Sequence, residues 1–431
     1  MKYTLKKGGK YVGQGSFGCG FAKPPLKCKN ETKRRNNTYI TKVFRNGRNA
    51  DEEINEGILW MNIDPEQKFS IYSEKKCYLD TDNVKSENEF DKCTLPFSKN
   101  SEKTMIVSKF GGQDLFELKP VAANYSKLFK SFVPLFKGLL KVHKSKVTHN
   151  DIKEENIVAT INDDSIDLRF IDFGYSYATK DMIEMNDIFL NTNYYYYWPF
   201  EFGCFDNQGN LYSPEKVKKR YHELVKMYKS DQRGFPINDV IAPKVDIDAL
   251  YQHYKTIDFK DFDNTFQKLD IYSLGITLVK ILYYYFKVFI KEGNNDFIYI
   301  VNLIDGNLVL HEEFLQNINN KYQKEWNTNV YTNIINPFVF LITQMVSISP
   351  SDRPSLEKII ESIEKIHPYI DEYLTTEKVR KGLYGFNILN NNPDDIVPPL
   401  PTPKPISPRR QFPPTTRLKI RNIKDTISKK K

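Results

Sequence analysis

The chain is poor in cysteine and lacks the motifs in which cysteines act together. Its 431 residues include five cysteines, and no two of them form a C-x-x-C pair. An odd number of scattered cysteines argues against a disulfide framework and against a zinc site. We therefore expect neither, and we take a reducing compartment as the default.

The chain also lacks a long apolar run that is free of charge. Residues 1–9 are polar and basic, so we expect no signal peptide there. The longest apolar stretch, 269–290, contains Asp270, Lys280 and Lys287, which would place charge throughout a bilayer core. We expect a soluble intracellular protein without a transmembrane segment, in which this stretch is a buried helix.

Acidic residues are too few to balance the basic ones, and the formal net charge is +9. Residues 392–431 contain ten basic and three acidic residues, which leaves only +2 for the rest of the chain, and they hold nine of the 23 prolines. We expect this basic, proline-rich tail to be disordered. Docking of an unknown partner remains an alternative for it. A specific nucleic-acid contact is disfavoured because aromatic residues are scarce there.

The pattern of apolar residues changes near residue 111. Before it, alternation predicts strands at 10–22, 38–44 and 104–110 and a helix at 50–63, whose apolar positions are Ile54, Ile58 and Met61. The polar range 80–104 is typical of an inserted loop. Beyond residue 111 the pattern is mostly helical, and two short strands stand out. The helices are expected at 121–143, 271–288, 331–345 and 355–366, and the strands at 157–161 and 167–172. We therefore predict an α+β protein with two lobes around a cleft.

Gly13–Gly18 is a G-x-G-x-x-G segment, which by itself is a weak signal. A dinucleotide-binding turn would need a helix directly after it. Here Pro24 and Pro25 follow a short strand-like stretch. A hairpin that covers the phosphates of a nucleotide fits better.

A polar set further along the chain carries a more specific signal. His149–Asn156 reads HNDIKEEN, and Asp172–Gly174 reads DFG. Transfer of a phosphoryl group to a hydroxyl needs a carboxylate to accept the proton, oxygen ligands for Mg²⁺ and cations against the phosphates. Asp151 supplies the first, Asn156 and Asp172 the second, and Lys153 a nearby cation.

In these two segments the chain resembles the eukaryotic-type protein kinase family, which carries H-R-D-x-K-x-x-N and D-F-G in this order. The resemblance covers about residues 10–370. It implies a two-lobed fold with a small strand-rich N-lobe at 1–110, which includes an insertion at about 64–103. A larger helical C-lobe would span 111–391 and include an insertion at about 202–267. The tail at 392–431 would follow it.

The resemblance assigns roles to single residues. Asp151 and Lys153 would be catalytic, and Asn156 and Asp172 would bind Mg²⁺. Lys42 would hold the phosphates of ATP. Its partner on the helix is expected to be Glu56, whereas exposed positions are expected for the competitors Glu52 and Glu53. The remaining residues expected to contact ATP are Val12, Gly13, Gln14, Gly15, Ser16, Phe17, Gly18, Cys19, Gly20, Phe110, Gly112 and Asp114.

Two further matches concern the helical part. Trp198–Glu201 resembles the A-P-E end of the family's activation segment, and Arg353 is expected to pair with Glu201. Asp270 resembles the start of the family's central helix. Lys153 is the form found in serine/threonine kinases, so Ser and Thr hydroxyls of proteins are the expected acceptors.

The chain departs from the family pattern at three positions. Asn150 replaces the arginine that receives an activation-loop phosphate, so we expect activity without phosphorylation of, for example, Thr179 or Thr192. Ile40 is larger and Gly20 smaller than the usual residues over the adenine, which suggests compensation in volume.

The order of motifs around Cys19 and Cys28 is similar to that in kinases of large nucleocytoplasmic DNA viruses, mimivirus-like ones in particular. That resemblance implies the host cytoplasm and leaves room for packaging in the virus particle. Two alternatives to a protein kinase stay open. One is a non-catalytic scaffold with the kinase fold, and the other is a kinase of a non-protein substrate, for which the long range 202–267 leaves space.

Overall fold

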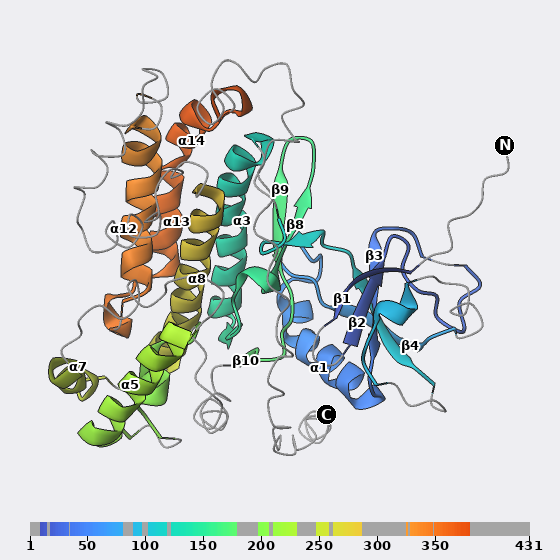
Figure 1. Ribbon diagram of the computed structural model, residues 1–431, viewed down its shortest axis with the longest axis horizontal. Coiled ribbons are helices and arrows are strands. Elements are labelled where there is room, and N and C mark those ends of the chain that lie inside the picture. Colours follow the sequence, from blue (N-terminus) through green and yellow to red (C-terminus); the bar gives the residue numbers. More distant parts are fainter. Residues whose placement is uncertain are drawn as a thin grey trace, which may run out of the picture.

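The computed structural model combines a strand-rich N-terminal part with a helical C-terminal part (Figure 1). It describes residues 9–14, 18–33, 35–80, 89–96, 102–118, 122–178, 197–206, 210–230, 247–257, 262–286, 325, 328–347 and 349–379. The tail 392–431 and the threonines Thr179 and Thr192 lie outside these residues, as do 207–209, 231–246 and 258–261 of the range 202–267. The predicted α+β class is confirmed.

The N-terminal part is built on a five-stranded antiparallel sheet in the order β1-β2-β3-β5-β4. Its strands are β1 (Lys10–Gln14), β2 (Gly18–Ala22), β3 (Tyr39–Phe44), β4 (Ser73–Tyr78) and β5 (Thr104–Lys109). The strands predicted from alternation are all present. Strand β4 lies within the range 64–103 that was expected to be an insertion, and it forms the edge of the sheet beside β5.

Helix α1 (Gly47–Ile63) packs on one face of this sheet, and the side chain of Asn46 caps its first turn by accepting the N–H of Asn49 at 3.0 Å. The opposite face carries a separate apolar cluster, which we call the outer cluster. It contains Cys19, Phe21, Leu26, Cys28, Val43, Leu79, Met105 and Val107. Because side chains alternate along a strand, Lys42 and its cross-strand neighbour Gly20 lie on the face of α1, whereas Cys19 and Val43 lie on the outer face.

The face of α1 that is buried differs from the predicted one. Ile58 and Met61 are 44% and 38% exposed, whereas Trp60 is fully buried. The ring of Trp60 stacks on Phe173 with centroids 4.3 Å apart. The large indole removes more apolar surface from water than Ile58 or Met61 would, and this sets the rotation of the helix about its axis.

The C-terminal part is a group of helices in which α3, α8, α12 and α13 lie side by side (Figure 1). Its helices are α3 (Tyr125–Lys144), α5 (Pro214–Ser230), α7 (Ile247–Tyr254), α8 (Phe262–Phe286), α12 (Asn336–Met345), α13 (Leu356–Glu364) and α14 (His367–Tyr373). A π-helical turn, η7 (Tyr331–Ile335), leads into α12, and short 3₁₀ turns occur at η1 (Phe90–Lys92), η2 (Ala122–Asn124), η3 (Glu154–Asn156), η5 (Phe200–Gly203) and η8 (Pro350–Asp352). None of the helices in the described part of the chain is long and apolar enough to span a membrane.

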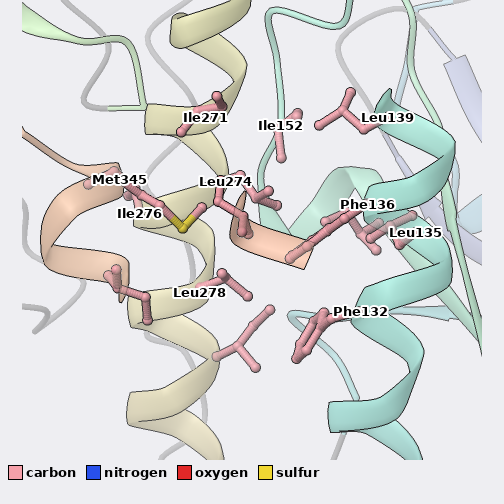
Figure 2. Close-up of a cluster of buried hydrophobic side chains, with 14 of the residues drawn as sticks. Phe132, Leu135, Phe136, Leu139, Ile152, Ile271, Leu274, Ile276, Leu278 and Met345 are labelled. Carbon is pink, nitrogen blue, oxygen red and sulfur yellow. The ribbon is translucent and has the colours of Figure 1, made fainter. Parts of the chain in front are cut away.

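The core of this part lies between α3 and α8 (Figure 2). Phe132 and Phe136 of α3 face Leu274 and Leu278 of α8, and Ile152 inserts between the two helices. Each such side chain contributes about 1.5–3 kcal/mol when it is fully buried. Ile152 directly follows Asp151, so this core also anchors the polar turn 149–156.

Small strands connect the two parts. The hairpin of β8 (Ile157–Ile161) and β9 (Ile166–Phe170) pairs with β6 (Gln113–Asp114), and β7 (Val147–Thr148) pairs with β10 (Tyr177–Ala178). The polar turn 149–156 thus lies between β7 and β8, and Asp172 follows the end of β9. Both therefore come to the side of the helical part that faces the sheet (Figure 1).

Candidate functional site

The turn from His149 to Asn156 is held by a buried carboxylate of helix α8. Asp270 is fully buried, and its two oxygens accept the backbone N–H groups of His149 and Asn150, each at 2.8 Å. Nε2 of His143 lies 3.0 Å from the same carboxylate. Hydrogen bonds to an ionised group are about twice as strong as neutral ones. They hold Asn150 in the left-handed region, at φ 63°, which is costly for a residue with a side chain.

Asp151 is the centre of the polar cluster in this turn. Its Oδ2 accepts a hydrogen bond from Nζ of Lys153 at 2.9 Å and one from Nδ2 of Asn156 at 2.8 Å. The amide of Asn156 also bonds the backbone oxygen of Asp151. Burial raises the pKa of Asp151 to about 6, against the lowering effect of Lys153. A carboxylate with a pKa near 6 is ionised at neutral pH and still basic enough to accept a proton.

Asp172 reaches this cluster from the end of β9. The backbone N–H of Ile171 donates to the oxygen of Asn156 at 3.0 Å, which fixes the two segments to each other. Asp172 has φ 62° and is exposed, while the next residue, Phe173, is buried against Trp60. The negative charge of Asp172 acts on Asp151, Lys153 and Lys42. The structure thus brings all of these predicted residues into one electrostatic neighbourhood.

Asn156 and Asp172 offer an amide and a carboxylate oxygen, which are hard ligands of the type that Mg²⁺ prefers. The amide nitrogen of Asn156 is bound to Asp151, and this arrangement turns the amide oxygen away from that carboxylate. Mg²⁺ usually takes one or two protein ligands and completes its octahedron with phosphate oxygens and water. The donor set therefore fits this ion. No group of three or more His, Cys, Asp or Glu side chains suited to a metal occurs among the described residues.

Lys42 brings a positive charge to the site from the sheet. Its Nζ lies 2.5 Å from Oε2 of Glu53, and the two side chains are 32% and 27% exposed. Burial lowers the pKa of Lys42, but the carboxylates of Glu53 and Asp172 outweigh this effect, so that pKa lies above its ordinary value. Lys42 is therefore a permanent cation in the physiological range.

Glu56 was expected to form the ion pair with Lys42, and Glu53 was expected to lie on an exposed face. The prediction of the ion pair is wrong, because Lys42 pairs with Glu53. Nζ of Lys42 contacts Glu53, which lies four residues before the buried Gly57. The carboxylate of Glu56 lies instead beside Gly174, with Oε2 3.5 Å from the position of a Cβ there. Its effect on Lys42 is weaker than that of Glu53. The prediction took Leu59 as the core residue of the helix, whereas Leu59 is only partly buried and Trp60 is fully buried.

The glycine-rich segment forms the hairpin of β1 and β2, in which Gly13 lies opposite Gly20. A Cβ at Gly18 would lie 2.8 Å from the backbone oxygen of Val43 and about as close to the side chain of Lys42. Only glycine permits this close approach of the hairpin to the lysine. Gly15, Ser16 and Phe17, which follow β1 and precede β2 in the sequence, lie outside the described residues. Gln14 and the partly exposed Val12 belong to β1.

Cys19 is fully buried in the outer cluster and forms a disulfide with Cys93, and a second disulfide joins Cys28 to Cys77. The prediction that the chain has no disulfide framework is therefore wrong, and the default of a reducing compartment loses its basis. Cysteine spacing shows nothing about pairs that the sheet brings together across 74 and 49 residues. Cys204, which is buried, is a free thiol.

The segment after β5 connects the two parts of the molecule. The N–H of Phe110 donates to the oxygen of Thr38 at 2.8 Å. Gly112 has φ 96°, and a Cβ there would lie 1.9 Å from the oxygen of Ala159, so no other residue fits. Asp114 accepts the N–H of Glu117 at 2.8 Å, and burial raises the pKa of Asp114 to about 7. Its carboxyl group thus titrates near neutral pH.

Two contacts of Asn150 were not foreseen. Its side chain amide donates to the oxygen of Tyr175, and its backbone oxygen accepts the indole N–H of Trp198, both at 2.8 Å. Asn150 therefore connects both Tyr175 and Trp198 to the turn. The sequence carried no signal for these contacts beyond the substitution itself.

A buried charged network was also missed. Lys280 of α8 donates to Oε1 of Glu154 at 2.5 Å, and the hydroxyl of Tyr197 donates to the other oxygen of Glu154. All three side chains are almost completely buried. The signal was present, because a lysine inside an apolar helix demands a buried partner. The predicted pairing of Arg353 with Glu201 is confirmed, through two hydrogen bonds of 2.6 and 2.9 Å between fully buried side chains.

No model of a known protein family matches the chain, and no curated protein is significantly similar to it.

Proposed function

We propose that the chain is an ATP- and Mg²⁺-dependent serine/threonine protein kinase with a two-lobed fold, in which the sheet and α1 form the small lobe. One observation carries the proposal. Lys42 from the sheet, Asp151, Lys153 and Asn156 from the turn, and Asp172 from the end of β9 lie within one electrostatic neighbourhood. Phosphoryl transfer needs a base, cations and metal ligands together, and these residues supply all of them.

The roles follow from the chemistry of each group. Asp151, with its pKa of about 6, orients the acceptor hydroxyl and takes its proton. Lys153 bonds the same carboxylate and offers its charge to the transferred phosphoryl group, whose negative charge is spread over three oxygens. Lys42, which Glu53 holds, binds the α- and β-phosphates. Asn156 and Asp172 hold Mg²⁺, and this ion neutralises the phosphates when it is bound.

The surrounding backbone supports binding of the nucleotide. The β1–β2 hairpin reaches over Lys42 because Gly18 permits the close approach. Phe110 and Gly112 offer main-chain groups to the adenine, and Asp114 offers its carboxyl group to a ribose hydroxyl. The serine/threonine preference depends on Lys153 alone, by the resemblance given above, and the same holds for a viral origin and for packaging in a particle.

Transfer of labelled phosphate from ATP to a generic protein substrate tests the proposal. Asp151→Asn and Asp172→Asn keep the side-chain shapes and should reduce the rate about 10²- to 10⁴-fold, the range that general-base catalysis contributes. Asp164→Asn, in the exposed turn between β8 and β9, is the matched control and should be unchanged. Equal rates for all four proteins would contradict the catalytic reading, and phosphoamino-acid analysis distinguishes Ser and Thr from Tyr acceptors.

The two alternatives separate in the same assay. A scaffold would show no transfer from the wild type to any acceptor, even if ATP binds. A kinase of a small molecule would hydrolyse or transfer phosphate without labelling protein. The hydrogen bond of Asn156 to Asp151, together with the nearby charge of Asp172, favours catalysis, because a scaffold gains nothing from a buried carboxylate whose charge is costly.

A further inference from the structure

A short segment, residues 89–95, lies against the outside of the β1–β2 hairpin, and we call it the clamp segment. Phe90 stacks on Phe21 of β2 with centroids 5.4 Å apart and an angle of 12° between the rings. Oε2 of Glu89 accepts the backbone N–H of Tyr11 in β1 at 2.6 Å. The clamp segment therefore contacts both strands of the glycine-rich hairpin.

The clamp segment also reaches the glycine-rich sequence itself. The backbone N–H and the hydroxyl of Thr94 both donate to Oε1 of Gln14, at 2.9 and 3.1 Å. Gln14 is the residue between the first two glycines of the motif. Since these hydrogen bonds are exposed to water, they are weak unless something holds Thr94 in place.

The disulfide from Cys93 to Cys19 holds it. Cys93 precedes Thr94, and Cys19 lies in β2 opposite Gln14. The disulfide thus fixes the clamp segment at the point where Thr94 bonds Gln14 of the hairpin. Cys19 is fully buried, whereas Cys93 is partly exposed. Cys93 is therefore the more accessible of the two cysteines.

We propose that the Cys19–Cys93 disulfide is a redox-sensitive site that sets the position of the glycine-rich hairpin and, through it, the affinity for nucleotide. The proposal depends on the function proposed above. In the oxidised state the clamp segment holds Gln14 and keeps the hairpin over the phosphates. In the reduced state Thr94 is released, and the hairpin must be ordered by the nucleotide itself, which costs binding free energy.

The reagent class is a dithiol, and the exchange is balanced as follows. One thiolate of the dithiol attacks Sγ of Cys93, the sulfur–sulfur bond breaks, and Cys19 leaves as a thiolate. The second thiolate of the dithiol then displaces Cys93 and closes a cyclic disulfide. Two electrons pass from the dithiol to the protein, and the two cysteines take up two protons. Oxidised glutathione, itself a disulfide, reverses the exchange.

The second disulfide provides a control within the same chain. Cys28–Cys77 joins the outer cluster to β4, which is the edge strand farthest from β1 in the sheet order. None of the described contacts of the clamp segment with Tyr11, Gln14 or Phe21 involves Cys28 or Cys77. Reduction of this bond should leave the glycine-rich hairpin in place.

The test measures the Kd of Mg-ATP for the full chain, oxidised and after treatment with dithiothreitol, with the thiols verified by alkylation and mass spectrometry. We expect reduction to weaken binding about 5- to 20-fold, the size expected for two hydrogen bonds that preorganise a site. The variant Cys28→Ser/Cys77→Ser should keep both the oxidised affinity and the response. Cys19→Ser/Cys93→Ser should bind weakly under both conditions.

Two results would overturn the proposal: equal affinity in the oxidised and the fully reduced wild type, or a response that follows Cys28–Cys77 instead. Thr94→Val keeps the disulfide and removes one hydrogen bond to Gln14. It should weaken binding of Mg-ATP about 2- to 5-fold, and since Thr94 is exposed, the variant should fold like the wild type. An unchanged affinity in this variant would also count against the clamp.

Failure of the proposed function can be recognised separately. If the oxidised wild type binds no Mg-ATP, the kinase proposal fails, and hydrogen exchange still tests the clamp. Reduction should then speed amide exchange in residues 10–14 and 18–22 while the exchange of β5 stays the same. Unchanged exchange in the hairpin would refute the clamp regardless of nucleotide.

Discussion

The ion pair of Lys42 is the feature that a single pair of variants tests most sharply. Glu53 lies 2.5 Å from Nζ of Lys42, whereas Glu56 lies beside Gly174. Glu53→Gln removes the charge and keeps the shape. Without that carboxylate, Asp172 is the strongest remaining negative charge acting on Lys42. We expect the lysine to move toward Asp172 and away from the proposed phosphate site.

The size of the effect follows from the geometry. A hydrogen bond to a charged group contributes about 1.5–3 kcal/mol. Both side chains are roughly a third exposed, and since water screens the pair, the lower part of that range applies. About 1.5–2 kcal/mol corresponds to a loss of about 10- to 30-fold in kcat/KM for ATP. Glu56→Gln should lose at most about fivefold, because the charge of Glu56 acts on Lys42 more weakly than that of Glu53 and a screened charge contributes about 0.2–1 kcal/mol.

The assay is the steady-state rate at varied ATP with a generic protein substrate, together with the Kd of Mg-ATP. Glu52→Gln is the matched control, since Glu52 lies in the same turn and pairs with the exposed Arg48. It should match the wild type. A larger loss for Glu56→Gln than for Glu53→Gln would refute the assignment and return the pair to the residue expected from the sequence. Equal losses would show that Lys42 does not distinguish the two.

Three further predictions concern the proposed base Asp151, the buried ion pair of Glu201 with Arg353, and the residues Gly20 and Ile40 over the proposed nucleotide site. Burial raises the pKa of Asp151 to about 6, above its value in the unfolded chain, so its effect on folding becomes more unfavourable as the pH rises from about 4 to 6. Asp151→Asn should therefore add about 1–3 kcal/mol to the free energy of unfolding at pH 7.5, and less at pH 4.5, when urea denaturation is compared at the two pH values; an equal gain at both would contradict the raised pKa. Glu201→Ala should lower the free energy of unfolding by about 3–5 kcal/mol, because it leaves Arg353 buried without its carboxylate. In the same denaturation assay, the double variant Glu201→Leu/Arg353→Met should lower it less than either single change does. Additive losses of stability would disprove the coupling. A Cβ at Gly20 would lie 3.5 Å from Cδ1 of Ile40. Gly20→Val should therefore weaken binding of Mg-ATP, and adding Ile40→Ala should restore it, with a coupling of about 0.5–3 kcal/mol between the two changes. Independent effects, or tighter binding by Ile40→Ala alone, would rule out compensation in volume.

The polar residues of the site were predictable because they lie close together in the sequence. Asp151, Lys153 and Asn156 occupy a single turn, and their contacts with one another follow from that closeness. Asp172 follows a strand that pairs with the strand after the turn, so a hairpin brings it near. These relations depend on local hydrogen bonds and short connections, which a sequence pattern reflects directly.

The helix α1 shows where such reasoning fails. Its existence and ends were predicted nearly correctly, but its buried face was not. Ile58 and Met61 continue the apolar pattern and are nevertheless exposed, because Trp60 packs against Phe173, a residue more than a hundred positions away. The ion pair of Lys42 is made by Glu53, three residues before the expected Glu56.

By itself the sequence determined most of the strands and helices and the polar turn 149–156, and the resemblance supplied the pairing of Arg353 with Glu201. Alternation, capping and motif spacing act over a few residues and leave their trace in the chain. Only the tertiary structure decided the partner of Lys42, the burial of Lys280 against Glu154, and the two disulfides. The physical reason is common to all three. Each depends on the rotation of a helix or the register of a sheet, and these are set by the total packing of residues distant in sequence.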